Sequence, residues 1–234
     1  DYMVKDTSLS AKLVGIIVHF ILLVLLITTL YPLLHIGSVS ISRNAAVWKN
    51  TVTFVPQGFD LTAYEAILKR GRLTTAFKNS VIYVVLGTTI NMLFTIAMAY
   101  AISKKRMAFR QFFITIAVIT LFFQGGLIPK FLVVKYTGLY NTMWALFIPT
   151  AIQTYYLILM RSFFQTLPKE LEDAAFVDGA NDITVLMKIA IPMSKAAIAT
   201  ITLFYAVYHW NSWFPAVIFL KDRVKYPLQV FLRE

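Results

Sequence analysis

Long stretches without a charged residue are the dominant pattern along this chain. Asp, Glu, Lys and Arg are absent from five stretches of 19 to 30 residues, at 13–42, 79–103, 111–129, 136–160 and 196–220. About 20 apolar residues in a helix cross the core of a bilayer, whereas a surface helix of a soluble protein needs a polar face. The pattern therefore predicts an all-α, polytopic transmembrane helical bundle. Its five spans are expected at about 13–36, 81–102, 112–129, 142–160 and 196–220.

Composition points to the same class of protein. Hydrophobic residues make up 59% of the 234 positions and charged residues only 14%, whereas soluble domains have about 45–50% and 25%. So apolar a chain is not a disordered one. The absence of Cys excludes a disulfide scaffold.

The basic residues suggest an orientation in the membrane. The short connection 103–111 carries three consecutive basic residues and a fourth close by, a density typical of a cytoplasmic loop. Segment 1–12 and the connection 161–195 would then be cytoplasmic, and 37–80 and 221–234 would lie at the outer face. Basic residues between 69 and 78 weaken this assignment. The chain lacks an initial Met, and we expect both ends, including segment 221–234, to be truncated.

Several kinds of chemistry are missing from the sequence. The spans hold no carboxylate, which disfavours an ion-driven secondary carrier, although backbone carbonyls can also bind sodium. No phosphate-binding G-x-x-x-x-G-K-[ST] loop occurs, so the chain should not hydrolyse ATP by itself. The three histidines are far apart and predict no metal site: His19, His35 and His209. An intramembrane enzyme would need a catalytic constellation, and none can be singled out.

The connection between the last two spans has a detailed pattern over 167–195. Pro168 suits a first helical turn, and the acidic residues that follow it favour the positive end of a helix dipole. Gly179 can end that helix in the left-handed conformation, and Asn181 or Asp182 can cap a second one. This predicts a helix, a sharp turn and a helix outside the bilayer. Small residues beside carboxylates suit a peg that fits a soluble partner, but a simple interfacial connector has the same pattern.

This connection resembles the cytoplasmic signature of ABC importer permeases, which reads E-A-A, three residues, G, nine residues and I-x-L-P. Residues 173–175 read Asp-Ala-Ala, Gly179 follows after three residues, and 189–192 read Ile-Ala-Ile-Pro after nine more. Asp173 replaces the usual Glu and Ile191 the usual Leu. The shorter Asp side chain would weaken or reset a contact with a partner.

Further segments are similar to the carbohydrate branch of that family, which handles oligosaccharides. They are 123–129 (FQGGLIP), 135–142 (KYTGLYNT), 210–213 (WNSW) and 226–229 (YPLQ). The resemblance implies a type I permease fold of six spans, with the sixth beyond residue 234. It also implies a place in a bacterial cytoplasmic (inner) membrane.

The resemblance further implies that the signature forms a coupling helix docked on an ATPase subunit. The corresponding contact residues are Glu172, Asp173, Ala174, Ala175, Asp178, Gly179 and Ala180. The implied partners are a second homologous permease, two ATPase subunits that bind ATP and Mg²⁺, an extracellular solute-binding protein, lipid and a sugar, with no nucleic acid. A secondary carrier or channel without ATPase subunits is the alternative.

Polar and aromatic side chains inside the spans are candidates for the sugar pathway. They are Gln124, Gln153, Tyr155, Tyr156, Tyr205, His209, Trp210 and Asn211. An unpaired amide is costly in lipid, so Asn211 should face a cavity or bond another helix. Gly125 and Gly126 are expected to break or hinge the third span, or to allow close packing. Residues 60–68 have helical character and predict an outer-face helix that docks the binding protein, or a spacer.

Overall fold

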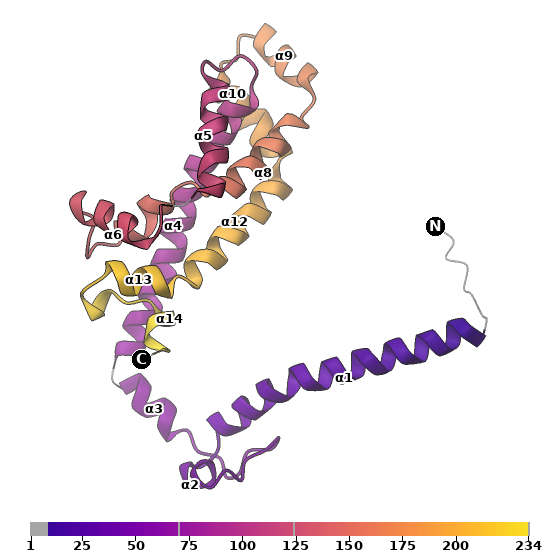
Figure 1. The fold of residues 1–234 in the computed structure, drawn as a ribbon, viewed down its shortest axis with the longest axis vertical. Helices are drawn as coiled ribbons and strands as arrows, with labels where there is room; N and C mark the ends of the chain where they lie inside the picture. Colours follow the sequence, from indigo (N-terminus) through magenta and orange to yellow (C-terminus); the bar gives the residue numbers. More distant parts are fainter. Residues whose placement is uncertain (1–8, 70, 124, 234) are drawn as a thin grey trace. The chain divides into compact units, whose positions relative to one another are not determined.

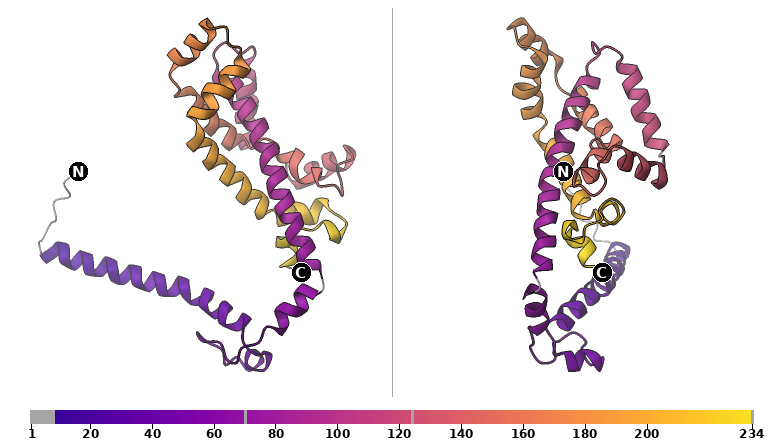
Figure 2. Two further views of the ribbon diagram at one scale, coloured as in Figure 1. Left: turned by 180° about the vertical axis from the view of Figure 1, so that it is seen from behind. Right: turned by 90° about the vertical axis from the view of Figure 1, so that its left-hand side faces the viewer.

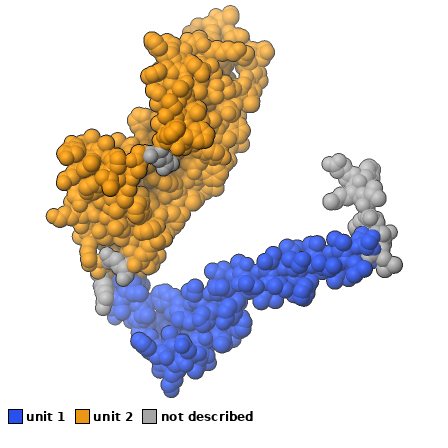
Figure 3. All heavy atoms as spheres, in the orientation of Figure 1, with its two compact units in different colours: residues 1–70 blue, residues 71–234 orange. Residues whose placement is uncertain are grey.

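The computed structural model describes residues 9–69, 71–123 and 125–233. The chain divides into two units, residues 1–70 and 71–234 (Figure 3). Across the described residues the secondary structure is helical, apart from one isolated antiparallel bridge between Ser42 and Phe59. The expectation of an all-α fold is confirmed.

The first unit is dominated by α1 (Leu9–Ser40), a helix of 32 residues. Its large apolar side chains are exposed in the isolated chain from Leu13 to Ile36. A helix that is hydrophobic all round is suited to lipid or to another chain rather than to water. The helix therefore fits the first expected span and extends a few residues beyond it at each end.

Short helices follow α1 in the same unit. Residues 41–60, which include α2 (Asn44–Trp48), fold back on themselves, and the backbone N–H of Arg43 donates to the carbonyl oxygen of Gly58 at 3.0 Å. The Asp60 carboxylate accepts a hydrogen bond from the N–H of Thr62 at 2.9 Å, which satisfies a free donor at the start of α3 (Thr62–Lys69). The helix expected near 60–68 is thus present.

The second unit is built around α4 (Arg72–Ser103), against which α8 (Thr154–Gln165) and α12 (Lys195–Trp210) pack along its length (Figures 1 and 2). The elements between and after them are α5 (Arg110–Phe122), α6 (Leu127–Tyr136), α7 (Trp144–Phe147), η1 (Ile148–Thr150), α9 (Lys169–Val177), α10 (Asp182–Val185), the π-helical turn η2 (Leu186–Ala190), α11 (Ile191–Met193), α13 (Trp213–Phe219), η3 (Arg223–Lys225) and α14 (Leu228–Phe231).

Three hydrophobic clusters fill the described interior of this unit. The first joins α4, α8, α10 and α12 and includes fully buried side chains such as Ile102, Met160 and Tyr205. The second joins α4, α7, α13 and α14 around Phe147, and a smaller third joins α6, α7 and α13. The first cluster supports the end of the unit where α9 and α10 lie, and α13 and α14 lie toward the opposite end (Figure 1).

Three of the five expected spans are not continuous helices, which corrects the sequence-based boundaries. In span 112–129 the helix ends at Phe122, and α6 begins only after Gly126, whose φ of 79° is left-handed. The break expected at Gly125 and Gly126 is confirmed. Span 142–160 is interrupted at 151–153, and span 196–220 at 211–212. Among the described residues, α1 and α4 are long and apolar enough to cross a bilayer, and the pair 182–193 and 195–210, bent by 85°, would be a third.

Candidate functional site

The segment between α8 and α12 folds as the helix, turn and helix that the sequence predicts. The first helix, α9, starts directly after Pro168, which is its N-cap, with φ −58° and ψ 125°, and so lies one residue before the helical turn in which the sequence suggested it. Glu170 and Glu172 lie in its first turn, where a negative charge interacts favourably with the helix dipole. We call residues 169–185 the coupling element from here on.

Gly179 forms the sharp turn between the two helices. Its φ is 80°, and the N–H groups of Gly179 and Ala180 donate to the carbonyls of Phe176 and Ala175 at 3.0 and 2.9 Å. These bonds satisfy carbonyls that would otherwise be free at the end of α9. A left-handed φ of this kind favours glycine, since other residues gain a steric conflict at Cβ.

Asn181 caps the second helix of the coupling element. Its side-chain oxygen accepts hydrogen bonds from the backbone N–H and the hydroxyl of Thr184, at 2.8 and 2.9 Å. An N-cap of this type satisfies one of the free donors of a helix start. Of the two residues expected to fill this role, Asn181 is the one that does so.

Burial divides the expected contact set into two faces. Asp173, Ala174, Asp178 and Gly179 are exposed, and we call them the outer face of the coupling element; Asp173 also lines the cavity beside residues 103–106. Ala175 and Ala180 are half-buried and pack on the first hydrophobic cluster. The outer face thus combines small side chains and two carboxylates, while the half-buried residues hold the element against the bundle.

Glu172 requires a correction to the expected contact set. Only 8% of the residue is exposed, and its carboxylate forms an ion pair with the ammonium group of Lys104. The residue was expected on the surface offered to a partner, but it faces the end of α4 instead. Neighbouring residues of a helix point about 100° apart, so Glu172 and Asp173 have different surroundings, and Glu172 is the one that pairs with Lys104.

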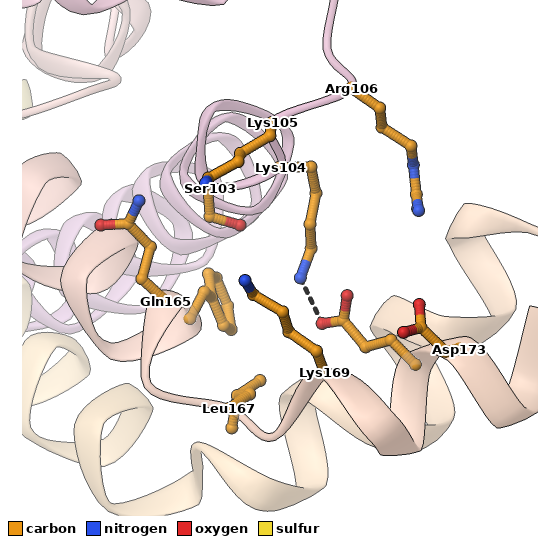
Figure 4. A pocket seen from close by; sticks show the side chains of 10 residues that line it. Ser103, Lys104, Lys105, Arg106, Gln165, Leu167, Lys169 and Asp173 are labelled. Carbon is orange, nitrogen blue, oxygen red and sulfur yellow. Dashed lines mark hydrogen bonds and ion pairs between the residues drawn. The ribbon is translucent and has the colours of Figure 1, made fainter.

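A cavity of about 390 Å³ lies between the coupling element and residues 103–106. Figure 4 shows the ion pair between Lys104 and Glu172 inside it, with Lys169 reaching in from the start of α9. Lys105 and Arg106 line the same cavity. The basic connection that the sequence places at the cytoplasmic face is therefore in direct contact with the coupling element.

Exposed apolar residues on the coupling element and just beyond it were missed by the sequence analysis. Val177, Ile183 and Met187 are 89%, 71% and 59% exposed. They lie in the connection 161–195, outside the expected spans, so the apolar pattern of a span does not explain them. The sequence holds one signal for two of them. Ile183 and Met187 are four residues apart, so a helix that begins after Gly179 places both on the same face.

The candidates for a sugar pathway do not form one site within the chain. Gln124 lies outside the described residues. Tyr205 is fully buried; its hydroxyl bonds the hydroxyl of Thr95 at 2.8 Å and accepts from the N–H of Gln153 at 3.0 Å. The ring of Tyr156 packs edge-on against that of Tyr205, with centroids 4.8 Å apart. These residues join α4, α8 and α12 where the helix preceding α8 is broken.

His209 belongs to the same interior. It is 2% exposed, its Nε2 lies 3.1 Å from the side-chain oxygen of Asn91, and the amide of Asn91 donates to the carbonyl of Thr150. Buried polar groups that are paired in this way fix helices relative to one another. His209 and Tyr205 therefore act as interhelical contacts, and neither lines an open path in the isolated chain.

Three further candidates are on the surface, although the ring of Tyr155 packs edge-on against that of Tyr156, with centroids 5.8 Å apart. Tyr155 is 62% exposed and Trp210 is 36% exposed. Asn211 is exposed, and its amide donates to the carbonyl of Val207 in its own helix at 3.0 Å. Within this chain the amide is therefore paired inside its own helix, and the expectation that it faces a cavity or another helix stays a prediction. These three residues remain available to a second chain or to a substrate.

An apolar helical bundle with a polar helix–turn–helix at one end is typical of an integral membrane protein that contacts a partner outside the bilayer. The chain belongs to the family of binding-protein-dependent transport system inner membrane components, which matches residues 91–223. It is a permease subunit of an ABC importer, and not a catalytic enzyme by itself.

Similar proteins include carbohydrate transport permeases. One is the polygalacturonan/rhamnogalacturonan transport system permease protein YtcP of Bacillus subtilis, 38% identical over 95% of this chain and 78% of the relative. Another is the arabinooligosaccharides transport system permease protein AraQ of Halalkalibacterium halodurans, 25% identical over 86% and 74%. A solved bacterial ABC transporter involved in the import of the acidic polysaccharide alginate has a chain with a TM-score of 0.94 and 37% identity, covering 97% of this chain and 81% of that one.

Proposed function

We propose that this chain forms a sugar translocation pathway together with a second permease, and that the coupling element receives the conformational change of two ATPase subunits. ATP and Mg²⁺ are bound by those subunits, and an extracellular binding protein delivers the sugar. The assembly lies in a bacterial cytoplasmic membrane. The observation that carries the proposal is the exposed outer face of the coupling element, with its left-handed turn at Gly179.

The position of the coupling element in the chain supports a mechanical role. Only residues 166–168 separate α8 from α9, and the second helix of the element continues through η2 and α11 into α12 with an 85° bend. A displacement of α9 is therefore passed directly to two helices that pack on α4. Such a displacement can shift the permease between two states only if the ATPase subunits bind the element differently in each.

The direct test is to purify the full assembly and to reconstitute it in vesicles. The proposal expects ATPase subunits to be recovered with the chain after gentle solubilisation. It also expects ATP enclosed in the vesicles, on the side of the ATPase subunits, to drive uptake of sugar. Recovery of the chain without ATPase subunits, together with uptake driven by an ion gradient, would support a secondary carrier and contradict the proposal.

For the substrate, we propose an acidic oligosaccharide. The support comes from two similar proteins, one named for polygalacturonan and rhamnogalacturonan and one for alginate. Labelled oligogalacturonate, alginate oligosaccharide and a neutral oligosaccharide of equal length should be compared for stimulation of ATP hydrolysis by the full assembly. The uronate-containing substrates should stimulate hydrolysis; stimulation by the neutral sugar alone would contradict the proposal.

The outer segment also receives a proposed role. Helix α3 carries no buried residue, and it follows a hydrogen-bonded turn at residues 41–60. We propose that α3 contacts the binding protein at the extracellular side of the membrane. Replacing Tyr64, which is 45% exposed, with Ala should weaken stimulation of ATP hydrolysis by the loaded binding protein. Unchanged stimulation would identify α3 as a spacer.

A further inference from the structure

The coupling element is attached to the bundle by more than its two chain connections. Residues 104–106, between α4 and α5, contact both of its helices. Lys104 forms an ion pair with Glu172 of α9, and Arg106 forms an ion pair with Asp182 at the start of α10. The guanidinium carbon of Arg106 also lies 4.2 Å from the ring centroid of Phe176, on the last turn of α9. One short segment thus holds both sides of the turn at Gly179.

The two ion pairs differ in burial, and this difference shows which of them contributes more to holding the coupling element. Side chains of Lys104 and Glu172 are 13% and 11% exposed, whereas those of Arg106 and Asp182 are 48% and 62% exposed. Exposed pairs contribute little because water and salt screen them. A nearly buried pair behaves differently, since removal of one partner leaves the other charge without compensation. The ammonium of Lys104 also lies 4.5 Å from the ring centroid of Tyr100 in α4, so it is fixed from both sides.

The need for such a contact follows from the joints at each end of α9. Residues 166–168 connect it to α8 and a glycine turn connects it to α10. Between these joints α9 has nine residues, of which Glu172 alone is buried, while Ala175 and Phe176 are half-buried and pack on the first hydrophobic cluster. Such apolar contacts hold α9 against the bundle but are not directional, so they do not by themselves fix its rotation. The ion pair with Lys104, at the end of α4, adds a directional contact and so fixes the angle at which the outer face is presented.

We propose that Lys104 and Glu172 are positioning residues that keep α9 rigid against the end of α4, so that movement of the ATPase subunits is passed to the membrane helices. This inference rests on the proposed function of the coupling element. Neither residue contacts ATP or sugar. Loss of the pair should leave ATP hydrolysis in place while less sugar is moved for each ATP hydrolysed.

The test uses the complete assembly in vesicles and measures the ratio of sugar taken up to ATP hydrolysed. Glu172→Gln should lower this ratio at least about five-fold, the lower end of typical coupling between sites. Glu170→Gln is the matched control: it removes the same charge from the same turn of α9, but its side chain is exposed and the ratio should not change. Exchange of the two charges, with Lys104→Glu and Glu172→Lys together, should restore at least half of the normal ratio.

The outcomes separate this proposal from the one on which it rests. If the unaltered assembly shows no ATP-driven uptake, the proposed function fails and the positioning role fails with it. If it couples normally and Glu172→Gln keeps the normal ratio, or lowers uptake and hydrolysis in equal proportion, only the positioning role is overturned. Should Glu172→Gln not assemble, the exchanged pair decides: coupled uptake supports the proposal, and an uncoupled or unassembled exchanged pair overturns it.

Discussion

The turn at Gly179 allows a sharp prediction, because the cost of changing it can be separated from packing. A Cβ added at Gly179 would meet no atom of the chain within 4 Å, so its cost is that of the backbone alone, at a φ of 80°. A left-handed conformation costs an L-residue about 1–2 kcal/mol, and a β-branched residue more. This shifts the equilibrium between the native turn and relaxed alternatives by roughly 5–30-fold. Gly179→Val should therefore displace the two helices of the coupling element and uncouple ATP hydrolysis from uptake.

Gly138 provides a matched control for that variant. Its φ is 74°, it is exposed, and an added Cβ would again meet nothing within 4 Å, but it lies in the turn after α6. Gly138→Val should lower thermal stability by a similar amount and leave the ratio of uptake to ATP hydrolysis unchanged. Gly179→Asn should be milder than Gly179→Val, since Asn tolerates the left-handed region. Normal coupled uptake by Gly179→Val at normal membrane levels would refute the reasoning.

Two further predictions concern stability and can be measured by thermal unfolding of the chain in detergent. Gly87→Ala should destabilise the fold by about 1–3 kcal/mol, the usual cost of overpacking, because the new Cβ would lie 2.6 Å from the buried ring of His209. The control Gly15→Ala adds a Cβ in open space and should be neutral or stabilising. Equal effects of the two substitutions would contradict the packing account. The hydrogen bond from Lys225 is the main cause that lowers the pKa of the Asp222 carboxyl below 3.8. Its stabilisation is present above the usual pKa of the carboxyl and is lost as pH falls through the lowered pKa, so Asp222→Asn should reduce the melting temperature at pH 7 and reduce it progressively less as the pH is lowered into that range; a pH-independent difference would contradict this.

The spacing of charged residues predicts the positions of apolar helices better than it predicts the breaks within them. Gaps between charged residues locate a span because a charge is costly in lipid, and α1 and α4 follow from them. The breaks at 151–153 and 211–212 contain only apolar or neutral residues, so they leave no gap in the charge pattern. Only Gly126, which needs a left-handed φ of 79°, marked a break in advance.

The coupling element shows the same division between local and distant information. Its two helices, its glycine turn and its cap depend on neighbouring residues, and all were predicted. The direction of Glu172 depends instead on Lys104, 68 positions away in the sequence. Helical geometry separates the directions of Glu172 and Asp173 by about 100°, but it does not determine which of the two carboxylates pairs with Lys104. The burial of Tyr205 between three helices is likewise a tertiary property.

The most direct test of the central claim is site-specific cross-linking in the intact membrane. A photoreactive residue at Val177, which is 89% exposed on the coupling element, should form an adduct with an ATPase subunit. The same residue at Val224, which is 74% exposed and lies in η3 beside Asn79 near the start of α4, should form none. If Val177 yields adducts only with lipid or with the permease itself, while the ATPase subunits are present, the coupling element does not dock on them and the account is wrong.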